Sequence, residues 1–90
     1  MYNYIICLNS SKDRLNNNLY EAIASLGECL QILDSAWILI SESESISIKD
    51  KLVTFVGNDD IFFISQLSTP ADAAWLNLSA DETVWLKSKL

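Results

Sequence analysis

The chain has 90 residues, enough for one domain; half of them are apolar and a fifth are charged. These proportions are ordinary for a globular protein and exclude a disordered chain. The sequence contains no histidine, which excludes histidine general bases, nucleophiles activated by histidine and metal sites with histidine ligands.

The first third of the chain predicts a strand and then a helix. Tyr2–Leu8 is rich in aromatic and β-branched residues and stops at a polar stretch, which predicts a strand followed by a loop. Apolar residues then recur at helical spacing as far as Leu26, so a helix with one apolar face follows. Asn16–Asn18 offer caps for its start, where Asn18 and Glu21 have the spacing of a capping box, and Gly27 suits the left-handed position that ends a helix.

Two short apolar runs come next, Glu28–Leu33 and Ala36–Ser41, and they are separated by Asp34 and Ser35. This pattern predicts a β-hairpin with a tight turn. Asp-Ser is not the preferred Asn-Gly turn sequence, and a single long strand with a bulge is the alternative.

The second half predicts a helix, a strand and a final helix. Apolar residues at 3.6-residue spacing predict a helix over Ser45–Val56, and Gly57–Asp60 predicts a turn. Ile61–Leu67, which contains two phenylalanines, predicts a strand. After the short segment Pro70–Leu78, Ser79 and the glutamate three residues later have capping-box spacing for a last helix.

The order of these elements is β-α-β-β-α-β. It predicts a ferredoxin-like α+β fold, in which a four-stranded antiparallel sheet carries both helices on one face. We expect residues 1–68 to form this core and residues 69–90 to form a tail that packs on the sheet or at a dimer interface.

The predicted strands are apolar on both faces. Neighbouring residues of a strand point to opposite faces, yet residues 4–8, 37–40 and 61–64 are all apolar. Two helices cover one face only. Each large apolar side chain left exposed to water lacks the stabilisation of about 1.5–3 kcal/mol that its burial would give. The second face needs a cover, which can be the tail, a second copy of the chain, or both; a homodimer is favoured because the core of so small a domain is thin.

The net charge of −6 argues against nucleic acid as a partner. Affinity for nucleic acid comes mainly from Lys and Arg side chains that neutralise phosphates, and the 6 basic residues of this chain lie in separate pairs rather than in one stripe. The pairs are Lys12 with Arg14, Lys49 with Lys51, and Lys87 with Lys89.

Cys7 and Cys29 do not have the spacing of a redox motif, and two cysteines alone are too few to hold a zinc ion. Each lies in an apolar run, which favours buried free thiols in a reducing compartment. The N-terminus lacks a basic leader, and no apolar run is long enough to span a bilayer. We therefore expect a cytoplasmic protein without a membrane segment.

Five blocks of the sequence resemble the small bacterial proteins known as SinR-like, which are distinct from the helix-turn-helix repressor of similar name. The similarity runs nearly from end to end, and its most specific block is Leu33-Asp34-Ser35-Ala36-Trp37. The other blocks are Leu19-Tyr20-Glu21-Ala22-Ile23, Ser25-Leu26-Gly27, Ala73-Ala74-Trp75 and Trp85-Leu86-Lys87.

That family is similar to the small dimeric subunit of the CRISPR spacer-acquisition complex and to the virulence-associated protein D toxins. The resemblance implies a ferredoxin-like fold, a dimer formed through sheet faces or edges, and a role in bacterial defence or mobile-element biology. Some of these relatives are metal-dependent nucleases with an acidic residue at the end of the first strand. Cys7 or Leu8 occupies that position here, and neither is a ligand for Mg²⁺, so we expect no metal and no cofactor.

Asp34, Ser35 and Trp37 are the sharpest candidate for a partner-binding site. A carboxylate, a hydroxyl and an indole at one end of the sheet can together bind a protein partner or a nucleobase. The structural alternative is a turn whose polar side chains bond to their own backbone while the indole packs in the core. Trp75 and Trp85 are further candidates, as anchors of an interface or of the core.

Polar residues near the ends of the first and last strands offer weaker candidates. Asn9, Ser10 and Asp13 follow the first strand, where neutral oxygens make a weak metal site. Asp59 and Asp60 are adjacent, so on a strand they would face opposite ways, and a turn is the better interpretation.

These features predict a non-catalytic, dimeric protein-interaction module, with a homodimer and an unidentified protein partner. The alternative is a metal-dependent endoribonuclease of the toxin or CRISPR-associated type with a degenerate site. A third hypothesis is sequence-independent binding of nucleic acid, which would weaken steeply with salt.

Overall fold

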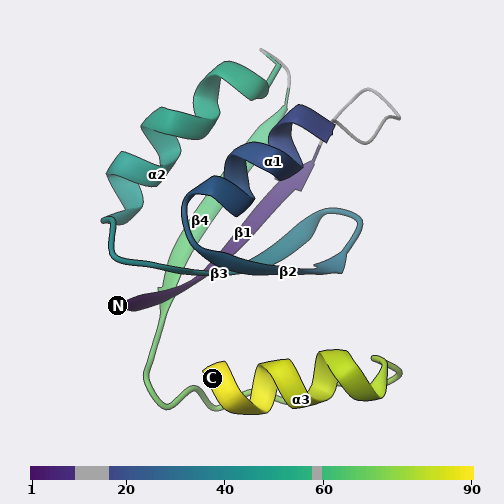
Figure 1. Cartoon of the computed structure of the whole chain (residues 1–90). Coiled ribbons are helices and arrows are strands. Elements are labelled where there is room, and N and C mark those ends of the chain that lie inside the picture. Colours follow the sequence, from purple (N-terminus) through teal and green to yellow (C-terminus); the bar gives the residue numbers. More distant parts are fainter. Residues whose placement is uncertain (10–16, 58–59) are drawn as a thin grey trace.

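A computed structural model describes residues 1–9, 17–57 and 60–90, which form an α+β fold with a four-stranded antiparallel sheet (Figure 1). The strands are β1 (Tyr2–Asn9), β2 (Glu28–Leu33), β3 (Ala36–Ser41) and β4 (Ile61–Leu67). Their order in the sheet is β2-β3-β1-β4, and each neighbouring pair is antiparallel. The edges of the sheet are therefore β2 and β4.

Helices lie on both faces of this sheet. α1 (Asn17–Ser25) and α2 (Ser45–Leu52) lie on one face, and α3 (Ala80–Lys89) lies on the other (Figure 1). A single 3-10 turn, η1 (Val53–Phe55), continues α2. Within the described ranges, no helix has both the length and the apolar character needed to cross a membrane.

The central hairpin has the bounds predicted from the sequence. Asp34 and Ser35 form its two-residue turn, which excludes a single long strand. A bulge is nevertheless present, but it lies inside β2, where the register with β3 shifts between Gln31 and Leu33. β4 also has its predicted bounds, and β1 extends one residue further, to Asn9.

The predicted boundaries of two helices are correct only in part. α1 begins at Asn17, within the range Asn16–Asn18 predicted to cap it, but Asn18 lies inside the helix and is not its N-cap. α2 ends at Leu52 instead of Val56, and the chain tightens into η1 at Val53 and Thr54. The β-branched side chains of these two residues lose rotamer freedom in an α-helix, which favours an early end.

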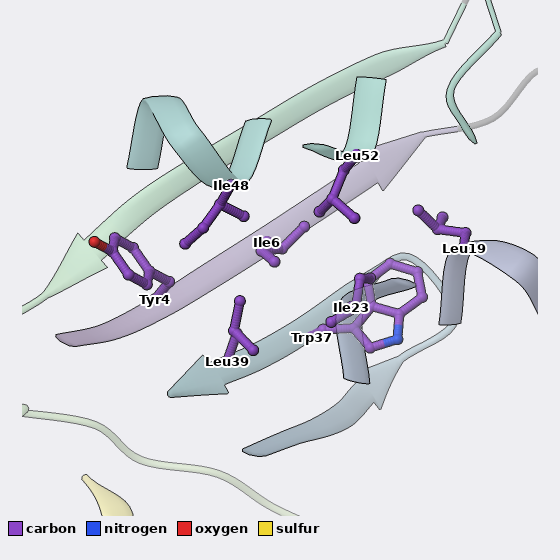
Figure 2. Close-up of a cluster of buried hydrophobic side chains, with 8 residues drawn as sticks. All are labelled: Tyr4, Ile6, Leu19, Ile23, Trp37, Leu39, Ile48 and Leu52. Atoms are coloured by element: carbon purple, nitrogen blue, oxygen red, sulfur yellow. The ribbon is translucent and has the colours of Figure 1, made fainter. Parts of the chain in front are cut away.

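The hydrophobic core fills the layer between the sheet and helices α1 and α2 (Figure 2). Eight large side chains meet there, and each is at most 4% exposed. Because side chains alternate along a strand, the residues of β1 and β3 that lie between these core residues point to the other face of the sheet. The core residues are Tyr4 and Ile6 of β1, Trp37 and Leu39 of β3, Leu19 and Ile23 of α1, and Ile48 and Leu52 of α2.

Two aromatic side chains bring polar groups into this core. The hydroxyl of Tyr4 donates a 2.7 Å hydrogen bond to the carbonyl of Ser43, which ties β1 to the loop before α2. Burial, followed by the nearby Tyr2 and Glu44, raises the pKa of Tyr4. The Nε1 of Trp37 is buried without a hydrogen-bond partner in the described chain, so this indole stabilises the core through its apolar area alone.

A capping box begins α3, as the sequence predicts. The backbone N–H of Glu82 donates to Ser79 Oγ at 3.1 Å, and the backbone N–H of Ser79 donates to Glu82 Oε1 at 3.0 Å. These reciprocal bonds satisfy backbone donors that a helix start otherwise leaves unpaired.

Acid should weaken this capping box. The backbone N–H of Ser79, and then its side chain, hold the pKa of Glu82 below its ordinary value of 4.5. A carboxyl group with a lowered folded-state pKa stabilises the fold above its unfolded pKa, and this contribution is lost as the pH falls through the folded pKa. Glu82→Gln should therefore be less stable than the parent at neutral pH and equal to it in strong acid, in urea titrations followed by circular dichroism.

The matched control is Asp81→Asn, which removes a charge from the first turn of α3 and leaves both reciprocal bonds intact. A Glu82→Gln deficit that stays constant from neutral pH to strong acid would contradict the prediction.

Candidate interaction surface

The register between the strands decides which side chains share the second face, by which we mean the sheet face opposite α1 and α2. Cys7 of β1 pairs with Ala36 of β3 on one side and with Phe63 of β4 on the other. Ala36 in turn pairs with Leu33 of β2, so four apolar residues form one row across this face. The two further rows are Leu30, Ile38, Ile5 and Ser65, and then Glu28, Ile40, Asn3 and Leu67.

Two polar contacts hold the end of the tail to the sheet, and a third joins the two ends of the tail to each other. The side chain of Asn3 donates from Nδ2 to the carbonyl of Lys89 at 2.9 Å, and the ammonium of Lys89 lies 2.5 Å from the carboxylate of Glu28. The backbone N–H of Ala71 donates to the carbonyl of Leu90 at 3.1 Å. The last turn of α3 is thereby fixed to the row that contains Glu28 and Asn3.

The tail shelters apolar side chains on the β3 part of the second face. Ile38 and Ile40 point to this face, and only 3% and 7% of their surfaces are exposed. Leu86 of α3 is itself buried, and Figure 1 shows α3 on this side of the sheet. The tail, one of the predicted covers, therefore occupies the part of the second face that lies over β3.

The β4 part of the second face stays in contact with solvent. Ile61 is 65% exposed and Phe63 is 57% exposed, and Cys7 beside Phe63 is half-buried. We name these three residues the β4 patch. Scattered apolar residues on a surface are ordinary, but these are neighbours, and covering a large apolar side chain yields about 1.5–3 kcal/mol.

The outer edge of β4 carries unpaired backbone groups. In an antiparallel sheet, consecutive residues direct their N–H and C=O groups alternately to the two sides of the strand. The N–H of Leu8 donates to the carbonyl of Ser35 at 2.8 Å, so even-numbered residues of β1 face β3 and odd-numbered ones face β4. Through the register, the odd-numbered residues of β4 face β1. The backbones of Phe62, Ile64 and Gln66 face outward, where the described chain places no further strand.

The two edges of the sheet differ in their protection against pairing. β2 begins with a charged residue, Glu28, and contains the bulge between Gln31 and Leu33, and both features oppose the addition of another strand. β4 contains no charged residue and no proline, and its register with β1 is unbroken. A long, uncharged, apolar edge is a template for pairing with another chain, so β4 with its patch is the candidate interaction surface.

The three residues predicted to form a site at the hairpin differ in burial: two are exposed and one lies in the core. Asp34 and Ser35 form the exposed turn, and the side chain of Gln31 donates from Nε2 to the carbonyl of Asp34 at 3.3 Å. Trp37 is 4% exposed and belongs to the core. Its indole is therefore not available at the surface together with the two polar side chains.

The other two tryptophans lie in the tail and are half-buried. The Nε1 of Trp75 donates to Oγ1 of Thr83 at 3.2 Å, which ties the segment before α3 to the helix. Trp85 is the residue before the buried Leu86 on α3. Both tryptophans thus belong to the tail, and neither lies at the hairpin.

The predicted loop residues are described only in part. Asn9 is exposed at the end of β1, opposite Ile61, whereas Ser10, Asp13 and Asp59 lie outside the described residues. Asp60 belongs to a turn: its Oδ2 accepts a 2.8 Å hydrogen bond from the N–H of Gly57, and its own N–H donates to the carbonyl of Gly57 at 3.1 Å.

A half-open pocket of about 480 Å³ lies where the tail meets the sheet. Its lining includes Asn3, Glu28 and Lys89, which are the residues that bond to one another across this junction. These polar groups bond to one another and hold the tail in place, so they are not arranged to bind a ligand in the pocket. The pocket is therefore a weaker candidate than β4.

In the part of the chain that the structure describes, the side chains that metal binding needs do not form a cluster. There, no three side chains of His, Cys, Asp or Glu lie close enough together to hold a metal ion. Cys7 and Cys29 are free thiols. Burial raises the pKa of the Cys29 thiol, which favours the neutral form over the nucleophilic thiolate.

Sequence reasoning predicts β4 as a strand with two apolar faces but places none of its residues in a site. The signal that could have identified this strand as a site is the absence of charged side chains from Ile61–Leu67. Combined with the element order, which puts the last strand at an edge of the sheet, this composition points to an edge that is open to pairing.

No family model matches the chain, nor does any curated protein or solved structure. The resemblance to the SinR-like family therefore stays a prediction. The geometry of β4 is the ground on which a function can be proposed.

Proposed function

We propose that this protein is a non-catalytic, homodimeric interaction module that binds a second copy of itself through β4. The observation that carries this proposal is the outer edge of β4, beside which the described chain places no strand, together with the exposed Ile61 and Phe63. A second strand would supply hydrogen-bond partners to the edge and would remove two large apolar side chains from water.

The finer architecture that we propose is the ferredoxin-like fold. The strand order β2-β3-β1-β4, the antiparallel pairing and the position of α1 and α2 on one face support it. In this arrangement the last strand is always an edge strand, so the fold itself makes β4 accessible.

The affinity of this contact should be modest. The contact buries Ile61 and Phe63 of both copies, and these four large apolar side chains contribute about 1.5–3 kcal/mol each, whereas association costs roughly 4–15 kcal/mol in lost translational and rotational freedom. A contact through one strand edge is near the lower end of specific interfaces, about 1,000 Å² in total. We therefore expect dissociation in the micromolar range.

The charge distribution favours β4 as the place where two copies meet. Two chains with a net charge of −6 repel each other, and the repulsion is smallest where the contact itself holds no charge, as in β4. The same net charge opposes binding to phosphate backbones. The two free thiols support a reducing compartment such as the cytoplasm.

Light scattering behind a sizing column, at a protein concentration of tens of micromolar, tests the proposal. The parent protein should have about 20 kDa, twice the chain mass of 10.1 kDa. Phe63→Asp should have the mass of one chain, because it places two carboxylates at the twofold contact. Val84→Asp is the matched control and should remain dimeric, because Val84 is 68% exposed but lies on α3.

Two results would overturn the proposal. A parent protein that elutes with the mass of one chain at this concentration rejects the homodimer. A Phe63→Asp variant that stays folded and dimeric rejects β4 as the contact.

A further inference from the structure

We infer that two β4 strands pair antiparallel around a twofold axis at Ile64, so that the two four-stranded sheets become one continuous sheet. This inference rests on the proposed homodimer and adds its register. It follows from which backbone groups of β4 face outward and which of them are already bonded.

Antiparallel pairing is the geometry that a twofold axis gives to two copies of one strand. A closed dimer uses the same surface on both copies, so that residue i meets residue j while j meets i. Two identical edges related in this way run in opposite directions, and each N–H faces a C=O of the other copy.

The outward backbone groups select the register. Phe62, Ile64 and Gln66 face outward, as the bond between Leu8 and Ser35 establishes. An axis at Ile64 places Phe62 opposite Gln66 of the second copy and each Ile64 opposite the other. All three outward residues then form hydrogen-bonded pairs, and each pair exchanges two bonds, about six in total.

The registers shifted by one residue to either side use fewer of these groups. An axis at Phe63 pairs Phe62 with Ile64 and leaves Gln66 opposite Asp60, whose N–H already donates to the carbonyl of Gly57. An axis at Ser65 pairs Ile64 with Gln66 and leaves Phe62 opposite residue 68, which lies beyond the end of β4. Ile64 is therefore the centre that leaves the fewest edge groups unpaired.

The same register joins the two β4 patches on the second face. Phe63 lies directly opposite Ser65 of the second copy, and Ile61 lies opposite Leu67 of the second copy. The two Phe63 rings are diagonal neighbours, a position from which aromatic side chains reach each other. The exposed rings thus cover each other and the small serine side chains between them.

Disulfide trapping distinguishes this register from its neighbours. Cys7→Ala and Cys29→Ala together remove the native thiols, and Phe63→Cys and Ser65→Cys are then made separately in that background. Positions 63 and 65 of opposite copies form a non-hydrogen-bonded pair with Cα atoms about 4.5 Å apart, within the range of a disulfide. Two copies of position 63 are diagonal, about 7–8 Å apart, and two copies of position 65 are diagonal as well.

When the two single-cysteine proteins are mixed and oxidised mildly, the mixed disulfide should exceed each homodisulfide severalfold, beyond the twofold excess of random pairing. Mass spectrometry separates the three products. Circular dichroism of each variant before oxidation establishes that it is folded. Because Phe63→Cys removes an apolar side chain and weakens the contact, the cross-linking is repeated at several protein concentrations.

Each other outcome overturns the inference in a recognisable way. A dominant homodisulfide of Phe63→Cys places the axis at Phe63, and a dominant homodisulfide of Ser65→Cys places it at Ser65. A dimer mass for the parent without any cross-link at either position rejects pairing of the β4 edges and leaves the homodimer standing. A single-chain mass for the parent rejects the proposed function as well.

Discussion

Replacement of Gly27 by alanine should destabilise the fold by about 3 kcal/mol, with a fall in Tm of roughly 15 °C. A Cβ atom at position 27 would overlap the carbonyl oxygen of Ile40, and it would lie 3.0 Å from the carbonyl carbon of Ile40 and 3.4 Å from the Cα of Ser41. These are backbone atoms of a central strand, so they cannot move aside without disturbing the pairing of β3. Thermal and urea unfolding followed by circular dichroism measure the loss.

Gly57→Ala is the matched control for this substitution. A Cβ atom at position 57 would meet only the side chain of Asp60, at 3.0 Å and beyond, and a side chain in a turn can shift. The control should lose much less stability. Equal losses for the two variants would show that the close approach of Ile40 does not determine the need for glycine.

Gln66→Pro should convert the proposed dimer into a folded monomer. The N–H of Gln66 faces away from β1 and has no strand beside it in the described chain, so the fold loses no ladder hydrogen bond when proline removes it. Proline is accepted at such outward positions of edge strands. In the dimer, however, the substitution removes two bonds by symmetry and puts a ring against the neighbouring strand. Light scattering and circular dichroism together measure both results.

Two neighbouring substitutions serve as controls for Gln66→Pro. Ser65→Pro should destabilise the monomer itself, because the N–H of Ser65 faces β1. Gln66→Ala keeps the N–H and should leave the dimer intact. If Gln66→Pro is folded and still dimeric, then the outer edge of β4 is not the contact.

The strands could be predicted from the sequence because each strand has a local signal. The runs Ala36–Ser41 and Ile61–Leu67 are bounded by turn residues, and both were predicted with their observed limits. The capping box of α3 depends on two residues three positions apart, and it was also predicted. These features are set by neighbours in the sequence, which a single sequence displays.

The features that were missed depend on contacts between distant residues. Gly27 was expected in the left-handed conformation at the end of a helix; its φ of 159° is positive and rarely adopted by residues with a side chain, although it differs from the left-handed helical value. The further constraint, which the sequence does not reveal, comes from Ile40, thirteen positions away. Likewise, the sequence predicts that the second face needs a cover, but which strands α3 reaches depends on contacts such as that between Asn3 and Lys89.

The candidate surface was missed for a related reason. Composition shows that residues 61–64 are apolar on both sides, but exposure separates Phe63, at 57%, from Ile38, at 3%. Both residues belong to the same face of the sheet, but Ile38 lies on an interior strand beneath the tail and Phe63 lies on an edge strand. The predicted site residue Trp37 shows the opposite case, because its place in the core depends on α1 packing over β3.

The bulge in β2 has a consequence for growth of the assembly. When two copies join at β4, both free borders of the combined sheet are β2 strands, each with its irregular register and its glutamate at the start. A third molecule would find no straight, neutral strand to extend. We therefore expect the proposed association to end at two copies, so that this protein does not polymerise into fibres even at concentrations far above those that saturate the pair.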